Sequence, residues 1–512
     1  MRVAFSEQRH GRGVDMDTQQ AKASSGNGAR DLRIAIIGAG PGGLCAAIRL
    51  RQSGFENFTV LEKGSGVGGT WYHNRYPGCA CDIQSELYSF SFEVNTEWTR
   101  PYARQPEILR YMEHCAEKYG VLPHCRFNDA VSSARWDEDN STWNLTTESG
   151  AEVTADVVIS ALGMFNDVPL PEIEGLGSFE GKTIHSARWD WDHDLAGETV
   201  GVIGSAASAV QLVPEIALEV GQLQVFQRTA NWVLPKEDDP YTPEEMAARQ
   251  ADPSIVVARR DELFEQVDTG MAFKDPKRQA EMEAIGRQAL EAVTDSELRA
   301  KLTPTHMWGC KRPLFHNEYF TTYNRSNVEL VTDAIERITP KGVLTVDGTE
   351  RVMDTMVLAT GFSTTKYLSA IEVIGRGGLH INDAWDDGAT AYMGITTTGF
   401  PNLFMLYGPN TNNGSIITMI EYQVDYALAH IQRLAAERLA WVDVKADTMA
   451  DYNQWVQEGI SEIRPWNASC NGYYRSPSGR IVTQWPHNMT TFKDQTAAID
   501  DDAYEVASLP AD

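Results

Sequence analysis

Two segments of the chain share one pattern of hydrophobic positions, in which a short apolar run ends in a small-residue turn and a helical pattern follows. The first apolar run covers residues 32–37 and the second covers residues 199–204. An apolar run without alternation is typical of a parallel strand that is buried on both faces. Further strands of this kind are expected at residues 58–62, 157–163, 223–228 and 355–361. The pattern predicts an α/β fold with two Rossmann-like dinucleotide-binding domains.

Other patterns occupy the segments between and after these units. Residues 135–150 are polar and rich in tryptophan and alternate in hydropathy, which predicts a hairpin or meander. Residues 241–302 are rich in Glu, Ala, Arg, Met and Gln, so we expect a helical insertion in the second domain. From about residue 400 a strand at 403–408 and a helix at 418–436 return the chain to the first domain.

These patterns divide the chain into four parts. Residues 1–31 are predicted to be a disordered tail, and residues 32–175 to be the first part of the first domain. Residues 176–375 are predicted to form the second domain, with the helical insertion at about 241–302, and residues 376–512 to return to the first domain. An acidic tail, which we expect to be loose, ends the chain: Asp500, Asp501, Asp502 and Glu505.

Composition narrows the classes of partner. The 512 residues include 44 lysines and arginines against 71 aspartates and glutamates, a formal net charge of −27, which disfavours nucleic acid as a partner. No apolar run reaches the roughly 20 residues that span a bilayer, and Met1–Arg30 has no apolar core of the signal-peptide kind. The seven cysteines form no C-x-x-C pair, which favours a reduced cytoplasm. We expect a cytoplasmic protein without a metal site, an integral membrane segment or an obligate protein partner.

The first turn has the spacing that a dinucleotide-binding site needs. Gly38, Gly40 and Gly43 form G-x-G-x-x-G between a strand and a helix, so that the backbone and the helix N-terminus face a pyrophosphate. Glu62 ends the next strand, where a carboxylate can bond ribose hydroxyls. The alternative is a tight turn without a ligand, which the combination of strand, helix and acid disfavours.

The second turn is a degenerate form of the same motif, with alanine where glycine is usual. Its candidate binding residues are Gly204, Ser205, Ala206, Ser208 and Ala209. The following strand ends in Arg228 and Thr229 rather than in an acid, which suits a ribose 2′-phosphate and therefore NADPH. The alternatives are a chance match of the turn and a solvated surface arginine.

Two further groups of residues are candidates for chemistry. Glycines 68 and 69, with Thr70 and Trp71, begin a loop that reaches Asp82 just beyond the first ribose site, where a flavin ring could lie. Asp82 is either an active-site acid or the cap of a following helix. Lys311 and Arg312 are adjacent cations in an acidic chain, and without further context a surface basic pair is the simpler interpretation.

A longer motif lies between the two turns. It reads F-x-G-x-x-x-H-x-x-x-W-D and consists of Phe179, Gly181, His185, Trp189 and Asp190. At these residues, and at the loop that ends in Asp82, the chain resembles the type I Baeyer–Villiger monooxygenases over about residues 33–495. Related flavin-containing and N-hydroxylating monooxygenases lack the Trp-Asp ending of this motif.

The resemblance implies an FAD- and NADPH-dependent enzyme that inserts one oxygen atom of O₂ beside a ketone carbonyl to give an ester or lactone. It implies that Arg312 holds the flavin C4a-peroxide, that Asp82 positions Arg312, and that Lys311 joins Arg228 on the 2′-phosphate. Thr70, Trp71 and Tyr88 fall on flavin-contacting positions. His185 and its neighbours resemble a linker between domains, and Ala206 departs from the glycine of the family pattern.

The substrate pocket is expected to be lined by the helical insertion, residues 360–370, residues 412–420 and residues 470–490. The alternatives to a Baeyer–Villiger enzyme are an N- or S-oxygenating flavin monooxygenase, an electron-transfer flavoprotein and a non-catalytic flavin sensor. Trp189 and Asp190 argue against the first alternative, and the second would not need Arg312.

Overall fold

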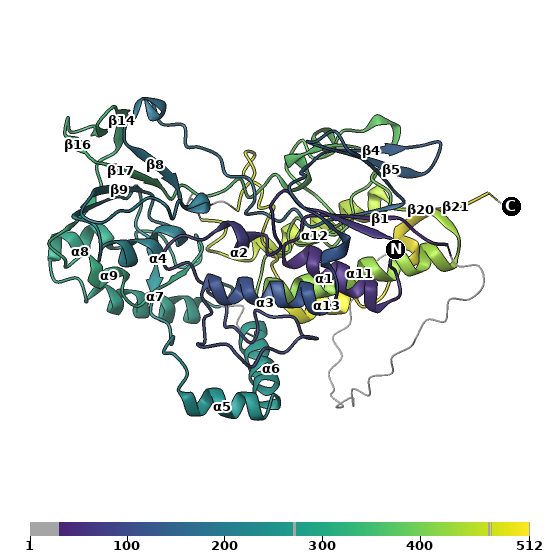
Figure 1. Cartoon of the computed structure of the whole chain (residues 1–512), viewed down its shortest axis with the longest axis horizontal. Coiled ribbons are helices and arrows are strands. Elements are labelled where there is room, and N and C mark those ends of the chain that lie inside the picture. The colour runs from purple at the N-terminus through teal and green to yellow at the C-terminus, as the bar shows by residue number, and fades with distance from the viewer. Residues whose placement is uncertain (1–29, 270–272, 469–471, 473, 511–512) are drawn as a thin grey trace.

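Two five-stranded parallel sheets occupy opposite halves of the molecule in the computed structural model (Figure 1). The structure describes residues 30–269, 273–468, 472 and 474–510, so all but the last two residues of the tail expected at 1–31 lie outside it. The first sheet has the order β19 (Leu403–Met405), β7 (Val157–Ser160), β1 (Ile34–Ile37), β2 (Phe58–Leu61) and β3 (Cys125–Arg126). The second has the order β13 (Val328–Val331), β10 (Gln222–Phe226), β9 (Thr199–Ile203), β17 (Thr355–Leu358) and β8 (Lys182–His185). The predicted pair of Rossmann-like units is confirmed.

Smaller sheets flank these two. One has the order β18 (Glu372–Ile374), β4 (Val131–Asp137), β5 (Thr142–Thr147) and β6 (Glu152–Ala155). In it β4 and β5 form the antiparallel hairpin that the sequence predicts near 135–150. A three-stranded sheet contains β14 (Ile335–Thr339), β15 (Gly342–Thr345) and β16 (Glu350–Val352), and a short parallel pair joins β11 (Val233–Leu234) to β12 (Leu314–Phe315).

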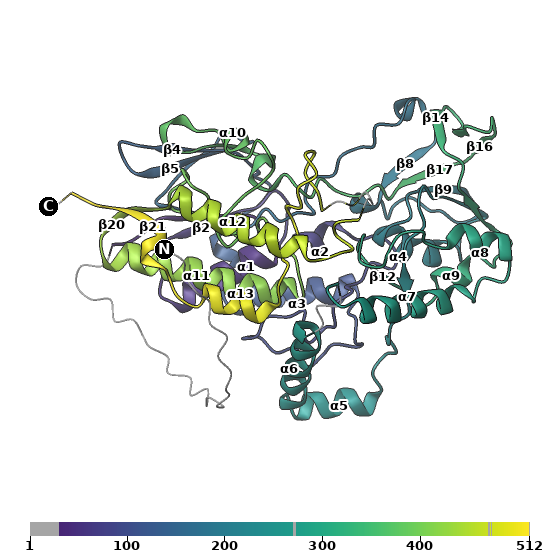
Figure 2. The same cartoon turned by 180° about the vertical axis from the view of Figure 1, so that it is seen from behind.

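Helices cover the sheets and connect the two halves (Figures 1 and 2). Those of the first half are α1 (Pro41–Gln52), α2 (Thr70–His73), α3 (Gln105–Lys118), α10 (Ile381–Ala384), α11 (Ile416–Ala436), α12 (Ala446–Ser461) and α13 (Met489–Thr496). Those between β9 and β13 are α4 (Ala207–Ile216), α5 (Pro243–Ala251), α6 (Ser254–Thr269), α7 (Pro276–Leu290), α8 (Ser296–Leu302) and α9 (Tyr319–Thr322). Helices α5 to α8 form the predicted helical insertion.

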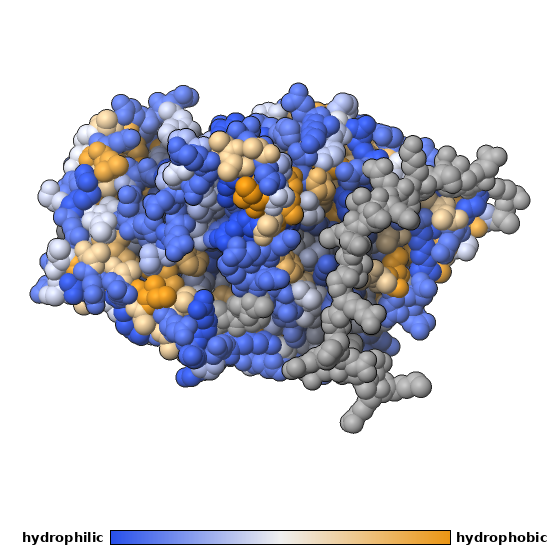
Figure 3. All heavy atoms as spheres, turned by 90° about the horizontal axis from the view of Figure 1, so that it is seen from below, coloured by the Kyte–Doolittle hydropathy of each residue, from blue (hydrophilic) through white to orange (hydrophobic). Residues whose placement is uncertain are grey.

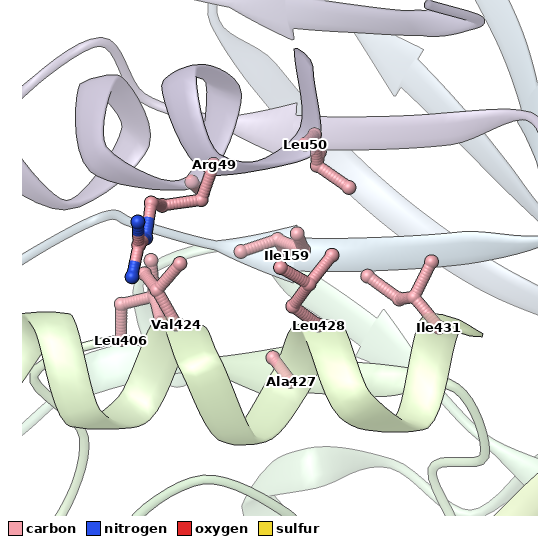
Figure 4. Close-up of a pocket in the computed structure, with 9 residues that line it drawn as sticks. Arg49, Leu50, Ile159, Leu406, Val424, Ala427, Leu428 and Ile431 are labelled. Carbon is pink, nitrogen blue, oxygen red and sulfur yellow. The ribbon is translucent and has the colours of Figure 1, made fainter. Parts of the chain in front are cut away.

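Helix α11 brings the C-terminal part of the chain back to the first sheet and packs along α1. Figure 4 shows the small apolar pocket between the two helices, which is lined by Leu50 from α1 and by Val424 and Ile431 from α11. Arg49 also lines this pocket and forms an ion pair with Asp425 of α11 at 3.1 Å. A long cationic side chain can cover apolar surface with its stem while its head stays near water. The pocket therefore belongs to the packing of the first domain.

The helical insertion contacts both domains. On α5, Arg249 forms an ion pair with Glu86 of the first domain at 2.5 Å, and both side chains are almost fully buried. On α6, Arg260 donates to the Glu86 carbonyl at 3.0 Å and lies 3.5 Å from the Glu421 carboxylate of α11. Helix α7 instead packs against β11. Figure 1 shows α5 and α6 below the first domain and α7 and α8 beside the second sheet. The insertion therefore fastens the two domains to each other.

The expectation of a loose acidic tail is wrong. Strand β21 (Tyr504–Ser508) pairs in antiparallel register with β20 (Leu439–Val444), and Tyr504 is buried. A short turn of helix at Asp501–Ala503 precedes this strand, with the Asp500 side chain accepting a hydrogen bond at its start. Acidic composition gave the wrong prediction because strand pairing and burial of one face outweigh local charge.

The described surface is mainly hydrophilic on the face shown in Figure 3, with scattered apolar patches. Over the whole described surface, the large exposed apolar side chains include Leu170, Trp191 and Leu218. Among the described residues, no helix combines the length and apolar character needed to cross a bilayer. Cys310 is disulfide-bonded, which the low cysteine count did not predict, whereas Cys45, Cys79, Cys81, Cys115 and Cys125 are free thiols.

The buried His430 makes the stability of the folded chain depend on pH. His430 is fully buried on α11, neither ring nitrogen has a partner among the described residues, and burial lowers its pKa to about 3. The unfolded chain takes up this proton below pH 6.5, whereas the folded chain does so only near pH 3. Between these values the site lowers stability by up to about 1.4 kcal/mol per pH unit on acidification.

The substitution His430→Phe keeps the ring that packs on Tyr426 and Tyr504 and removes the buried polar atoms. We expect it to raise the midpoint of thermal unfolding at neutral pH, since an unpaired buried polar group costs about 1–3 kcal/mol. We also expect a smaller fall of that midpoint between about pH 7 and pH 5. Thermal unfolding of both proteins at the two pH values tests this, and an unchanged pH response would contradict it.

Candidate functional site

A cavity of about 1400 Å³ is lined by side chains of both domains. It begins at the turn after β1, passes the loop that ends in Asp82, and reaches the start of α4 in the second domain. Helices α6 and α7 of the insertion add Val267 and Met282 to its wall. The segments 360–370, 412–420 and 470–490 contribute as well, so the expected lining segments are present. In open α/β sheets ligands bind at the carboxyl ends of the strands, where this cavity lies.

The three positions of the first turn require glycine for different physical reasons. A Cβ on Gly38, which has φ +100°, would lie 2.7 Å from the Ala161 carbonyl oxygen, and one on Gly43 would lie 1.9 Å from the Gly38 oxygen. A Cβ on Gly40 would meet only the Gly69 backbone, at an ordinary 3.4 Å. The fold itself therefore excludes side chains at 38 and 43. Gly40 lines the cavity, so its missing side chain leaves space for a ligand.

Glu62 follows β2 and is 5% exposed. One carboxylate oxygen accepts from the Ala39 backbone N–H and the other from the Gly64 backbone N–H, each at 2.7 Å. These bonds fix the carboxylate at the cavity wall, and each oxygen keeps capacity for a second donor. The arrangement suits a ligand that offers hydroxyl groups.

The second turn has the same backbone shape. Gly204 has φ +118°, and a Cβ there would lie 2.4 Å from the Ala359 carbonyl oxygen. Ala206 directly precedes α4 and provides no side-chain cap, and it lines the cavity together with Ser208. Ser205 instead donates to the Thr229 carbonyl at 3.2 Å, and Ala209 is buried in the core. The helix N-terminus thus faces the cavity with unbonded N–H groups.

Two cations lie near this turn. Arg228 follows β10 and is exposed. Burial lowers the pKa of Lys311, and the positive charge of Arg228 lowers it further, so the two side chains lie close together. Among the described residues no carboxylate forms an ion pair with either of them. Two neighbouring cations without an anion are a favourable site for a phosphate.

Asp82 and Arg312 form an ion pair although 230 residues separate them in sequence. The Arg312 Nε donates to Asp82 Oδ2 at 3.1 Å, and its Nη2 donates to the same oxygen. Both residues line the cavity and are partly exposed. The described chain forms no helix directly after Asp82, so its alternative interpretation as a helix cap is wrong. Arg312 is likewise part of the cavity wall rather than of a surface basic pair.

An aromatic pair lies on the first-domain side of the cavity. Trp71 Nε1 donates to the Tyr88 hydroxyl at 3.0 Å, and the rings meet edge to face with centroids 5.7 Å apart. Thr70 begins the short helix α2 that carries Trp71, and all three residues line the cavity. A fixed aromatic wall of this kind suits a planar ring system.

The motif between the turns forms a linker outside the cavity. Phe179 packs on the second sheet, and a Cβ on Gly181 would lie 2.3 Å from the Asp354 carbonyl oxygen. His185 ends β8, where burial lowers its pKa to about 4 and its Nδ1 accepts from the Ala187 N–H. The imidazole is therefore neutral, with its proton on Nε2.

The end of the linker contacts the first domain. Trp189 is buried and meets Trp191 edge to face, and Trp191 Nε1 donates to the Arg75 carbonyl at 2.9 Å. Asp190 forms an ion pair with Lys182 at 2.5 Å. Trp191, directly after the motif, thus contacts the first domain, and none of the five defined residues of the motif lines the cavity.

Sequence reasoning missed Gln211, whereas it expected the segments that hold Asn412 and Gln484 to line the pocket. Gln211 of α4 bonds the loop that leads to Asp82. Asn412 accepts from the Tyr407 hydroxyl at 3.0 Å and donates to Gln484 at 2.6 Å. The run of asparagine and glycine at 408–414 marks a loop, whereas a single glutamine in a helix gives no signal.

Known proteins share this architecture. A family model described as pyridine nucleotide-disulphide oxidoreductase matches residues 35–265. A Baeyer–Villiger monooxygenase of Pseudomonas aeruginosa is 39% identical over 507 residues, which cover 98% of this chain and 95% of that protein. The chain belongs to the Baeyer–Villiger monooxygenase family. The resemblance found at the linker motif and at the loop ending in Asp82 is thereby confirmed.

Solved structures of similar proteins add to this result. Cyclohexanone monooxygenase from Rhodococcus sp. Phi1, bound to NADP⁺, superposes with a TM-score of 0.85 at 30% identity and covers 93% of this chain and 99% of its own. A protein named OTEMO, in complex with FAD and NADP, has a TM-score of 0.83 at 29% identity, with the same coverage. The two-turn cavity of this Baeyer–Villiger monooxygenase fits two dinucleotides, because Gly40 leaves room for one and the start of α4, beside Arg228 and Lys311, offers donors to another.

Proposed function

We propose that this chain catalyses Baeyer–Villiger oxidation of a small-molecule ketone, with overall balance ketone + O₂ + NADPH + H⁺ → ester or lactone + NADP⁺ + H₂O. The observation that carries this proposal is the Asp82–Arg312 ion pair in the wall of a cavity that joins two dinucleotide-binding turns. We also propose a cytoplasmic location, because NADPH is available there.

The chain's residues divide into two binding sets. The turn at 38–43 and Glu62 would hold FAD, with Thr70, Trp71 and Tyr88 along its ring system. The turn at 204–209 would hold the NADPH pyrophosphate, with Arg228, Thr229 and Lys311 at the 2′-phosphate. Bound FAD supplies the transfer of electrons from NADPH to O₂.

Arg312 acts on the substrate side of the reaction. As oxygen adds to the ketone, negative charge develops on the carbonyl oxygen, and a fixed guanidinium beside it stabilises that charge. Asp82 keeps the guanidinium in place through the bonds from Nε and Nη2. The aromatic and aliphatic walls exclude water from the reacting oxygen, which limits its loss as hydrogen peroxide.

Arg228→Ala is expected to raise the KM for NADPH by about ten- to a hundredfold while leaving the KM for NADH almost unchanged. The reason is that Arg228 and Lys311 form a cationic pair suited to the 2′-phosphate, which NADH lacks. Steady-state kinetics with both nucleotides measure this effect. Equal losses for NADPH and NADH would contradict the assignment, and Arg325→Ala, at another arginine on the second domain, is the matched control.

The test of the proposed function compares substrate classes. Purified enzyme is given NADPH and air with a panel of cyclic, linear and aryl ketones, and separately with tertiary amines and sulfides. Ketones should accelerate NADPH oxidation and appear as esters or lactones. Turnover of amines or sulfides, with every ketone recovered intact, would establish the N- or S-oxygenating alternative.

A further inference from the structure

Gln211 connects α4 to a loop of the first domain through three hydrogen bonds. Its Oε1 accepts from the Tyr76 hydroxyl at 2.9 Å and from the Ala80 backbone N–H at 3.3 Å. Its Nε2 donates to the Ala80 carbonyl at 3.0 Å. One side-chain amide thus bonds both polar groups of the Ala80 backbone, as a neighbouring strand would, and fixes where Ala80 lies.

The same loop also contacts the start of α4. Ser208, which belongs to the second turn, lies near Tyr76, and both residues line the cavity. A Cβ on Gly78, which has φ +77°, would lie 2.5 Å from the Gln211 carbonyl oxygen, so the loop backbone lies directly on the helix. Tyr76 itself is buried. The turn that would hold NADPH and this loop therefore form one packed unit.

The loop leads directly to the ion pair. Ala80 bridges to Arg104 in antiparallel register, and the Cys81 N–H donates to the Ala103 carbonyl at 3.0 Å. Asp82 follows in this short extended stretch, and its carboxylate holds Arg312. Because the stretch is bonded on both sides, a shift of Ala80 is transmitted to Asp82 over only two residues.

We propose that Gln211 is a positioning residue that links occupancy of the second dinucleotide turn to the placement of Asp82, and through Asp82 to that of Arg312. The inference rests on the proposed function, since it takes the turn at 204–209 to be the NADPH site. NADPH or NADP⁺ at this turn would fix α4, and Gln211 would then order the loop that carries the acid. The guanidinium would thereby be set for chemistry when the nicotinamide nucleotide is present.

Another contact between α4 and the first domain provides a control. Glu215, one turn after Gln211, forms an ion pair with Arg104 at 3.1 Å, and both side chains are substantially exposed. Exposed pairs of this kind contribute little to stability. Glu215→Gln therefore weakens an interdomain contact of the same helix without removing a bond to Ala80, whereas Gln211→Met keeps the side-chain length and removes all three bonds.

The first experiment is hydrogen exchange on the FAD-loaded proteins with and without saturating NADP⁺. In the unsubstituted chain and in Glu215→Gln, NADP⁺ should slow exchange in segments 204–209 and 76–83 by about tenfold or more. In Gln211→Met it should still slow exchange at 204–209, but leave 76–83 unchanged. Protection of 76–83 in Gln211→Met equal to that in the unsubstituted chain would overturn the inference.

A double-mutant cycle tests the link to the acid. NADP⁺ dissociation constants are measured for Gln211→Met, Asp82→Asn and the double variant. If Gln211 acts through Asp82, the double variant should bind no more than about threefold more weakly than the weaker single variant. Full additivity of the two effects would overturn the inference. An unsubstituted chain that shows no NADP⁺ protection at 204–209 would contradict the proposed function itself, and the inference with it.

Discussion

Arg312→Ala should continue to oxidise NADPH but form ester about 10²–10³-fold more slowly, with hydrogen peroxide as the main product. The reason is local: the substitution removes the guanidinium that Asp82 holds at the cavity wall. That cation is needed only where negative charge develops during oxygen insertion, so consumption of NADPH and O₂ should be affected less. Assays of NADPH, hydrogen peroxide and ester in one reaction measure how much of the NADPH consumed leads to ester and how much to peroxide.

The fold should survive this substitution. The Asp82–Arg312 pair is partly exposed, and such pairs contribute at most about 1 kcal/mol to stability. Thermal unfolding and FAD content should therefore match those of the unsubstituted chain. Arg312→Lys serves as the control for charge, because it keeps a cation but lacks the Nε and Nη2 donors that bond Asp82. Full ester formation by Arg312→Ala would remove the role assigned to this residue.

Gly40→Ala should fold normally but bind FAD about 10- to 100-fold more weakly, because a methyl group forced into a close contact costs roughly 1–3 kcal/mol. Its Cβ would meet the protein only at 3.4 Å, from the Gly69 backbone, and would otherwise enter the space left for the ligand. FAD titration of the apoprotein by fluorescence measures the affinity, and thermal unfolding of the apoprotein measures the fold.

Gly43→Ala provides the contrast. Its Cβ would lie 1.9 Å from the Gly38 carbonyl oxygen, so this substitution should destabilise the apoprotein itself. The two substitutions thus distinguish a glycine that ligand binding requires, Gly40, from one that folding requires, Gly43. Normal FAD affinity in Gly40→Ala would contradict the assignment of the first turn to the flavin nucleotide.

Local patterns predicted the strands and both turns because their causes are local. A parallel strand buried on both faces requires an apolar run, and β1 is such a run, fully buried. Gly38 and Gly204 require positive φ at the end of a strand, which only glycine adopts at low cost. These features therefore have a direct signature in the chain.

Features that depend on distant partners had no such signature. From the residues alone, Asp82 was as consistent with a helix cap as with an active-site acid, and only family resemblance suggested its pairing with Arg312. The bonds of Gln211 go to the backbone of Ala80, which could be any residue type. The acidic end of the chain was predicted to be loose because its charge was visible, whereas its partner strand β20 lies 60 residues earlier.

The most direct test of the account is the fate of ¹⁸O₂ when the enzyme, NADPH, a mixture of ketones, a tertiary amine and a sulfide react in one vessel. Mass spectrometry of the products locates the label. The account predicts one labelled atom in the bridging oxygen of an ester or lactone, with an unlabelled carbonyl oxygen. Label in the amine or sulfide product alone, with every ketone unchanged, would contradict it.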